Sequence, residues 1–234
     1  MAVTMHPIID PGDVAWITET DMIEVDRTMI EDLRIELLQM MENAGRNLAR
    51  LVLDLAAPMR VAVAAGSGGN GGGGLVAARH LANAGVDVTV TTTRPGDELS
   101  PVPAHQFDIL RRMGIPTEPK LGEADVIIDS LIGYSLRGAP SGRSAALIDA
   151  INDHPAMVVS LDAPSGLDVT TGATPGAVVR AGATLTLALP KVGMRDADVV
   201  GALYLADISV PRSVAAAYGS PAPDFRRGSI LRII

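Results

Sequence analysis

Short apolar runs rich in β-branched residues alternate along the chain with longer segments in which apolar residues recur every three or four positions. The short runs predict buried strands and the longer repeats predict helices with one apolar face. Strands that alternate with helices form βαβ units, so the pattern predicts an α/β fold, a three-layer αβα Rossmann-like sandwich with a mostly parallel central sheet. The expected strands cover residues 61–65, 86–92, 124–131, 157–161, 183–189 and 201–208, and the expected helices cover 19–30, 33–55, 75–81, 106–113 and 142–152.

The two ends of the chain carry weaker signals. Residues 1–16 have the character of a loose arm, so we expect an N-terminal arm over 1–17 and a single α/β domain over 18–234. Thr18 and Asp21 have the spacing of a capping box, which predicts a helix start at this point. The segment 95–103 is expected to be a loop. The tail from Pro211 is expected to be irregular, with its apolar last residues packed on the body of the protein.

A glycine cluster lies between an expected strand and an expected helix, within RVAVAAGSGGNGGGGLVAARH at residues 60–80. Glycines in a tight turn permit a positive φ and let the backbone approach a ligand closely. The free N–H groups at a helix start favour an anion such as phosphate. A flexible linker is the alternative, but linkers are not usually flanked by a buried strand and an amphipathic helix. The stretch therefore predicts a phosphate-binding loop, although Walker A spacing is absent and no particular nucleotide is indicated. Gly45, inside the second helix, predicts close packing of another element there.

Composition narrows the classes of protein that fit. The chain has 234 residues, of which 47% are hydrophobic, which suits one sizeable core. Its net charge of −8 argues against non-specific binding to nucleic acid or to an anionic membrane. There is no apolar run near the roughly 18 residues that span a bilayer, no signal-peptide pattern at the start, and no cysteine. A cytoplasmic protein without disulfides or thiolate zinc sites is the expectation.

Polar residues follow three of the expected strands, in loops at 66–74, 129–138 and 162–168. The carboxyl ends of parallel strands meet at one edge of a sheet, so these loops should converge there. Asp129 and Asp162 each end an apolar strand; either alone fits a turn or cap residue. Together with Asn70 and Ser165 they offer only oxygen ligands, which suit a hard cation or a group of sugar hydroxyls rather than zinc. The four histidines are scattered, and no Ser/His/Asp triad is visible.

Five ordered motifs resemble the YjeF N-terminal domain family, whose enzymatic members are NAD(P)H-hydrate epimerases. The glycine segment at 66–81 resembles that family's G-P-G-N-N-G-G-D-G-L-V-A-A-R-x-L, and DSLIGYSLRG at 129–138 resembles D-A-L-x-G-T-G-L-x-G. DAPSGLD at 162–168, followed by TG, resembles D-I-P-S-G-L-D. MENAGR at 41–46 and PKVG at 190–193 resemble the family's M-E-x-A-G-R and P-K-x-G. The likeness extends from about residue 18 to residue 210.

The resemblance implies an isomerase that interconverts the R and S epimers of NADHX and NADPHX, the hydrated nicotinamide nucleotides, by inversion at ring carbon 6. It implies one K⁺ per subunit, held by Asn70, Asp129 and Ser165 together with backbone carbonyls. Asp162 is our candidate catalytic residue for proton transfer. Lys191 is a candidate second polar group, with a surface lysine an equally good interpretation. The implied substrate-binding residues are Gly69, Asn70, Gly71, Gly72, Gly73, Gly133, Tyr134, Ser135, Leu136, Arg137, Gly138, Ala139 and Asp162.

The resemblance also implies a homodimer and a separate ADP- or ATP-dependent dehydratase in the same repair pathway, with no nucleic-acid or membrane partner. Three departures from the family pattern matter: Gly69 replaces an asparagine, Gly73 replaces an aspartate, and the pair Tyr134-Ser135 replaces Thr-Gly. Relatives of this fold also act as assembly domains. A catalytically impaired nucleotide-binding or assembly module is therefore the alternative, and an altered nucleotide substrate is a third interpretation.

Overall fold

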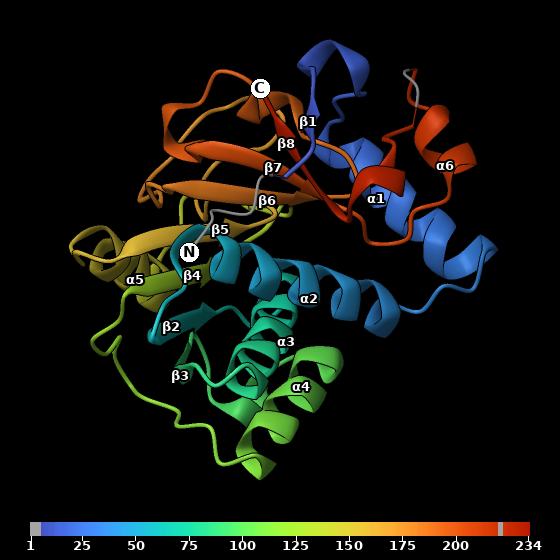
Figure 1. The fold of residues 1–234 in the computed structure, drawn as a ribbon. Coiled ribbons are helices and arrows are strands. Elements are labelled where there is room, and N and C mark those ends of the chain that lie inside the picture. The colour runs from blue at the N-terminus through green and yellow to red at the C-terminus, as the bar shows by residue number, and fades with distance from the viewer. Residues whose placement is uncertain (1–5, 220–221) are drawn as a thin grey trace.

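A computed structural model describes residues 6–219 and 222–234 and places their strands in one eight-stranded sheet (Figure 1). The strand order is β1-β8-β7-β6-β5-β4-β2-β3, and every neighbouring pair is parallel except β7 with β8. This confirms the predicted α/β class and the mostly parallel sheet. The strands are β1 (Ile8–Ile9), β2 (Arg60–Ala65), β3 (Asp87–Thr92), β4 (Val126–Ser130), β5 (Met157–Leu161), β6 (Ala183–Leu187), β7 (Ala202–Ala206) and β8 (Ile230–Ile233).

Helices cover both faces of the sheet, as Figure 1 shows. Alternate side chains of each strand point to opposite faces, so Val61 and Val63 of β2 join the core under α2, α3 and α4, while Ala62 and Ala64 join the core under α5. A third apolar cluster joins α1 to residues 163–169 and to the far side of β7 and β8. The helices are α1 (Glu19–Arg27), α2 (Leu37–Ala56), α3 (Gly69–Asn83), α4 (Pro101–Arg112), α5 (Gly142–Asn152) and α6 (Arg212–Ala216).

The start of the first helix follows the predicted capping box. The Thr18 hydroxyl accepts the backbone N–H of Asp21 at 3.2 Å, and the Asp21 carboxylate accepts the backbone N–H of Thr18 at 2.8 Å. After α1 the chain forms a π-helical turn at Thr28–Asp32, and Arg34 then adopts a φ of 58°. The second helix therefore begins at Leu37, four residues later than the apolar spacing predicts.

The predicted loose arm is wrong where the structure describes it. Ile8 and Ile9 pair with β8, the side chains of Val14 and Ile17 are buried, and Ile17 forms a bridge to Lys191. Residues 1–5 lie outside the described part of the chain. These pairings attach the segment before Thr18 to the same sheet as the rest of the protein.

Two other expectations need correction. The predicted irregular tail contains α6 and the antiparallel strand β8, although its last apolar residues are buried as expected. The helix expected from Gln106 begins at Pro101, because a proline suits the first helical position, where its missing N–H is no loss. Within the described residues, no helix combines the length and apolar character needed to cross a membrane.

Candidate active site

The glycine segment forms the entry into α3 and packs tightly against the sheet. A Cβ on Gly66 would collide with the carbonyl of Leu131, one on Gly71 with the carbonyl of Gly66, and one on Gly74 with the hydroxyl of Ser130. None of the glycines from 66 to 74 has a positive φ, so the left-handed conformation that glycine permits is not used here. Their small size is what the fold requires, since it brings the first turns of α3 against the carboxyl ends of β2 and β4.

The N-terminus of α3 faces open space. A Cβ at Gly68 or Gly69 would meet no atom within 4 Å, and the N-cap residue Gly68 supplies no side-chain hydrogen bond. The first N–H groups of a helix lack partners inside the helix and carry partial positive charge. This end of α3 is therefore able to receive an anion. Gly45 packs against Val76 and the carbonyl of Gly73, which confirms the close contact predicted at that glycine.

Asp129, the fourth residue of β4, is fully buried and surrounded by neutral donors. Its Oδ1 accepts the Ser165 hydroxyl at 2.5 Å and the Leu131 N–H at 3.2 Å. Its Oδ2 accepts the Ser160 hydroxyl at 2.8 Å and the Ser165 N–H at 2.9 Å. Burial raises the pKa of this carboxyl, and the hydrogen bonds oppose the rise. Within the described residues, no cationic side chain pairs with it.

Asp162 follows β5 directly and has a different kind of partner. Its φ of 65° is left-handed, a conformation that aspartate tolerates better than most residues. Its Oδ1 forms an ion pair with Lys191, whose ammonium also donates to the Thr186 hydroxyl at 3.1 Å and the Leu187 carbonyl at 2.9 Å. Both side chains are buried. The interpretation of Lys191 as a surface lysine is thus wrong.

Tyr134 connects Asp162 to a third carboxylate. Its backbone N–H donates to Asp162 Oδ2 at 2.9 Å, and its hydroxyl donates to Asp26 Oδ2 at 2.6 Å. Burial raises the pKa of Asp26 above its ordinary value, and burial next to Asp26 raises the pKa of the Tyr134 phenol. The tyrosine that departs from the family pattern therefore makes a specific contact between its loop and α1.

A cavity of about 310 Å³ opens between α1, the start of α2, the start of α3 and the ends of β5 and β6. Seven of the predicted site residues line it, and the rest of its lining is mainly apolar. Leu136–Ala139, Gly71 and Gly72 are not part of this lining, and Arg137 instead pairs with Glu19 at 2.5 Å. The predicted residues that line the cavity are Gly69, Asn70, Gly73, Gly133, Tyr134, Ser135 and Asp162; the other lining residues are Met22, Asp26, Ile30, Leu37, Met40, Met41, Ala44, Leu161, Leu187 and Ile208.

The three predicted cation ligands are only partly brought together. Asp129 and Ser165 are in direct contact, whereas Asn70 lies beside Gly133, where a Cβ would be 3.2 Å from the Asn70 amide and 3.0 Å from Asp162 Oδ2. The amide nitrogen of Asn70 is buried and has no hydrogen-bond partner among the described residues. A buried carboxylate without a counter-charge and an oxygen-only donor set fit a hard cation. Within the described chain, no three His, Cys, Asp or Glu side chains form a metal cluster.

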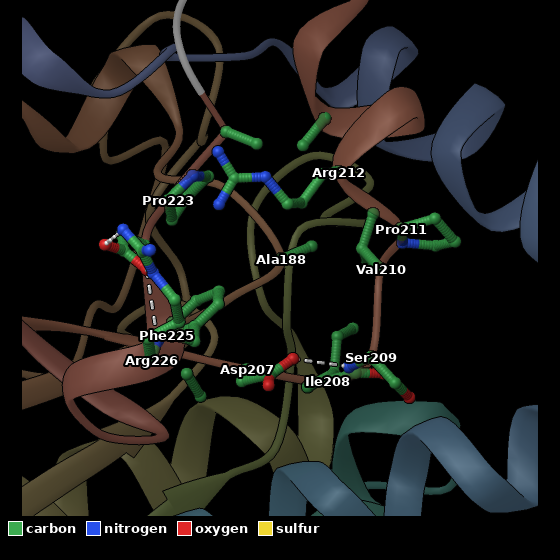
Figure 2. Close-up of a pocket in the computed structure, with 14 residues that line it drawn as sticks. Ala188, Asp207, Ile208, Ser209, Val210, Pro211, Arg212, Pro223, Phe225 and Arg226 are labelled. Atoms are coloured by element: carbon green, nitrogen blue, oxygen red, sulfur yellow. Dashed lines mark hydrogen bonds and ion pairs between the residues drawn. The ribbon is translucent and has the colours of Figure 1, made fainter.

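A second cavity of about 310 Å³ lies further along the same edge of the sheet (Figure 2). Ile208 borders both cavities. Among the residues that line it, Asp224 pairs with Arg226 at 2.6 Å and Asp207 accepts the N–H of Ser209 at 2.7 Å. Its described lining contains none of the predicted site residues. The predicted site residues therefore converge on the first cavity and not on the second.

Reasoning from the sequence did not identify Asp26 as a site residue. Its position on an amphipathic helix carried no sign that it faces a cavity. Its contact with Tyr134 joins residues 108 positions apart, and no local pattern reveals such a pair. Lys191 carried a weak signal, since it is one of two lysines in the chain and part of the PKVG motif.

Comparison with known proteins agrees with this architecture. A family model described as YjeF-related protein N-terminus matches residues 37–193. An NAD(P)H-hydrate epimerase of Dehalogenimonas lykanthroporepellens is 48% identical over 206 residues, which cover 85% of this chain and 83% of that protein. A bifunctional NAD(P)H-hydrate repair enzyme of Hyperthermus butylicus is 42% identical over 83% of this chain, which spans only 38% of that longer protein. A yeast crystal structure superposes with a TM-score of 0.82 at 21% identity, over 94% of this chain and 100% of that one, and shows the shared fold. The chain belongs to the YjeF-related protein N-terminus family.

Proposed function

We propose that this protein is an NAD(P)H-hydrate epimerase, an isomerase that interconverts the R and S epimers of NADHX and NADPHX in the repair of nicotinamide nucleotides. The observation that carries the proposal is the convergence of Asp162, which the buried Lys191 holds by an ion pair, and the open N-terminus of α3 on one cavity. The 48% identity to an NAD(P)H-hydrate epimerase supports the same reaction.

The cavity suits both ends of such a substrate. Its apolar wall, which includes Met22, Met40 and Leu161, fits the face of a reduced nicotinamide ring. The uncapped N–H groups at the start of α3 fit a phosphate of the nucleotide. Gly69 faces open space, so its departure from the family's asparagine leaves this approach unobstructed.

Inversion at carbon 6 requires the hydroxyl to leave as water and water to return to the opposite side. The group that protonates the departing oxygen must lie within reach of the ring, and Asp162 borders the cavity with one oxygen bonded to Lys191 and the other to the Tyr134 N–H. Lys191 fixes the orientation of this carboxylate, because its ammonium is itself held by Thr186 and Leu187. We assign proton transfer to Asp162.

A potassium ion is part of the proposal. Asp129 and Ser165 would hold it, with Asn70 contributing its amide oxygen, since this set offers oxygen donors and one buried negative charge. Bound there, the ion would supply positive charge that organises the loops after β4 and β5. The homodimer, the use of both NADHX and NADPHX, and a dehydratase acting in the same repair pathway are further parts of this proposal. Light scattering on the purified protein tests the dimer, which a 24 kDa species would contradict.

The test is the epimerisation of purified (R)-NADPHX, with and without potassium, followed by chromatography of the two epimers. We expect acceleration over the spontaneous rate, dependence on the cation, and loss of the acceleration in Asp162→Asn. The control is Asp125→Asn, because Asp125 lies beyond the opposite end of β4, where it accepts the N–H groups of Met59 and Arg60.

Wild-type protein that binds nucleotide in a thermal-shift assay but gives no acceleration would favour the alternative, a catalytically impaired nucleotide-binding or assembly module. Asp162→Asn also leaves the buried Lys191 without its charged partner. Its folded state must therefore be checked by circular dichroism before loss of turnover is attributed to chemistry. A folded variant with the wild-type rate would contradict the assignment of Asp162.

A further inference from the structure

Two carboxylates, rather than one, face the candidate active-site cavity. Asp162 enters from the end of β5 and Asp26 enters from α1, and both line the same space. Tyr134 lies between them: its backbone N–H donates to Asp162 and the hydroxyl at the far end of its side chain donates to Asp26. The two carboxyl groups are therefore separated by about the length of a tyrosine residue within a single cavity.

The surroundings of the two carboxylates differ in charge. Asp162 is ion-paired with Lys191, whereas Asp26 is partly buried and forms no ion pair among the described residues. The neighbouring Arg27 is engaged by Glu24 and Asp32. The groups that act on Asp26 are Tyr134, which stabilises the ionised form by a hydrogen bond, Asp162, which disfavours it, and Lys191, which favours it more weakly. Burial outweighs them and raises the pKa of Asp26, so this carboxyl takes up a proton more readily than an ordinary aspartate.

Inversion of a carbon that carries a hydroxyl needs proton transfer on two sides. One group must protonate the oxygen that leaves, and another must accept a proton from the water that arrives opposite. Enzymes that invert a carbon with two carboxyl groups keep them far enough apart to admit the substrate and a water molecule. Asp26 and Asp162 line one cavity and are held at the two ends of Tyr134, which keeps the two carboxyl groups apart.

We propose that Asp26 is a second catalytic residue, which transfers the proton on the side of the substrate ring opposite Asp162, and that Tyr134 is the residue that positions it. This inference rests on the proposed epimerase function. Tyr134 binds Asp26 Oδ2, while Oδ1 forms no hydrogen bond within the described structure and is left for the reacting oxygen. Tyr134, which replaces the family's threonine, therefore has a role in this proposal, because its hydroxyl holds Asp26 in position.

The step balances as follows in one direction. The protonated carboxyl gives its proton to the hydroxyl on carbon 6, the carbon–oxygen bond breaks with its electron pair leaving on water, and the lone pair of the ring nitrogen forms a carbon–nitrogen double bond. Water then forms the new carbon–oxygen bond from the other side, the double-bond pair returns to nitrogen, and the surplus proton passes to the second carboxylate. Exchange with solvent restores both carboxyl groups. The reverse reaction exchanges their roles.

An isotope experiment separates the two roles. Each purified epimer of NADPHX is incubated with enzyme in ¹⁸O-labelled water, and mass spectrometry and chromatography report label uptake and inversion. In Asp26→Asn we expect inversion to fall by about 10²-fold or more. The epimer whose hydroxyl faces Asp162 should still take up label with retained configuration, and the other epimer should not. Asp162→Asn should give the converse result: label uptake with retained configuration should persist only in the epimer whose hydroxyl faces Asp26.

Two further variants control this result. Glu24→Gln lies on the same helix but is exposed, so its inversion and exchange should match wild type. Tyr134→Phe keeps the ring and removes the hydroxyl that holds Asp26, so we expect inversion to fall about tenfold while exchange on the Asp162 side persists.

The outcomes separate this inference from the function on which it rests. Wild-type protein that accelerates neither inversion nor exchange contradicts the epimerase itself. Wild type that is active, with Asp26→Asn unchanged in inversion, contradicts the role of Asp26 alone. A parallel loss of inversion and of exchange in both epimers, in Asp26→Asn and Tyr134→Phe alike, would reduce the Asp26–Tyr134 contact to a structural one.

Discussion

Asp129 and Asp162 end adjacent parallel strands, are both buried, and are held in opposite ways. Asp129 is surrounded by two hydroxyls and two backbone N–H groups, all neutral, which occupy both of its oxygens. Asp162 has one backbone N–H and a buried ammonium, and it borders the cavity. Burial alone therefore does not identify the reactive carboxylate. The reactive carboxylate is instead identified by its charged partner and by its access to the cavity.

The two carboxylates therefore have different roles at the ends of β4 and β5. Three of the four donors around Asp129 come from Ser160 and Ser165, and the Ser165 hydroxyl also accepts the Ile132 N–H, so that carboxylate organises the loops that shape the site. Asp162 depends on one charged group for its electrostatic balance, and it borders the cavity, where a ligand can contact it. Substitutions that remove the partners of each carboxylate test whether this division is correct.

The largest expected effect is on the ion pair. Lys191→Met keeps the approximate shape of the side chain but leaves Asp162 buried without a counter-charge, so we expect the free energy of unfolding to fall by about 3–5 kcal/mol. The double variant Asp162→Asn/Lys191→Met removes both charges and should recover a large part of that loss. Urea unfolding measures both. A loss below about 1 kcal/mol in the single variant would mean that Asp162, like Asp129, is stable with neutral donors alone.

Asp129→Asn tests the other half of the comparison. Both carboxylate oxygens accept a backbone N–H, from Leu131 on one side and Ser165 on the other, so either orientation of the amide directs its NH₂ group at a donor. We expect a loss of about 1–3 kcal/mol in buffer without potassium, measured by urea unfolding. Ser160→Ala, which removes one hydroxyl donor, should cost less. Equal stability of Asp129→Asn and wild type would contradict the assignment of a stabilising role to these four hydrogen bonds.

The sequence predicted the central strands because each is a short run rich in apolar and β-branched residues, a signal that does not depend on distant residues. It missed β1 and β8, which contain two and four residues at the chain ends and form only because they pair with each other and with β7. It also placed the start of α3 too late. Each glycine disfavours a helix by about 1 kcal/mol, but the close packing of Gly71 and Gly74 against the sheet overrides that preference.

The sequence predicted those residues of the candidate site that belong to its motifs. Asn70, Asp129, Asp162 and Ser165 lie at the carboxyl ends of strands or in the segments that follow them, so the rule for parallel sheets places them at one edge. The contact of Tyr134 with Asp26 and the burial of Lys191 depend on how loops from separate parts of the chain pack together. No local spacing encodes either of them.

Asp162 has a charged partner and Asp129 has none. Bound potassium should remove this difference by giving Asp129 a counter-charge. A ligand present at ten times its Kd stabilises the folded state by about 1.4 kcal/mol. We expect KCl to raise the melting temperature relative to tetramethylammonium chloride at the same ionic strength, and the rise to vanish in Asp129→Asn. An identical rise in wild type and variant would place the ion elsewhere.

The smallest expected effect concerns Asp26, which lacks both the neutral donors of Asp129 and the ammonium of Asp162. Because its pKa is raised in the folded state, it favours folding most below its ordinary value near 3.8, and this contribution is lost as the pH rises through the raised value. Asp26→Asn should therefore gain stability relative to wild type as the pH rises from about 3 to 7, by up to about 1 kcal/mol. The amide oxygen can still accept the Tyr134 hydroxyl. Urea unfolding of both proteins across this range measures the difference, with Glu24→Gln as the exposed control on the same helix. A difference that stays constant with pH would show that Asp26 has the same affinity for protons in the folded and unfolded chain. That result would remove the electrostatic argument for its role while leaving the isotope experiment to decide the geometric one.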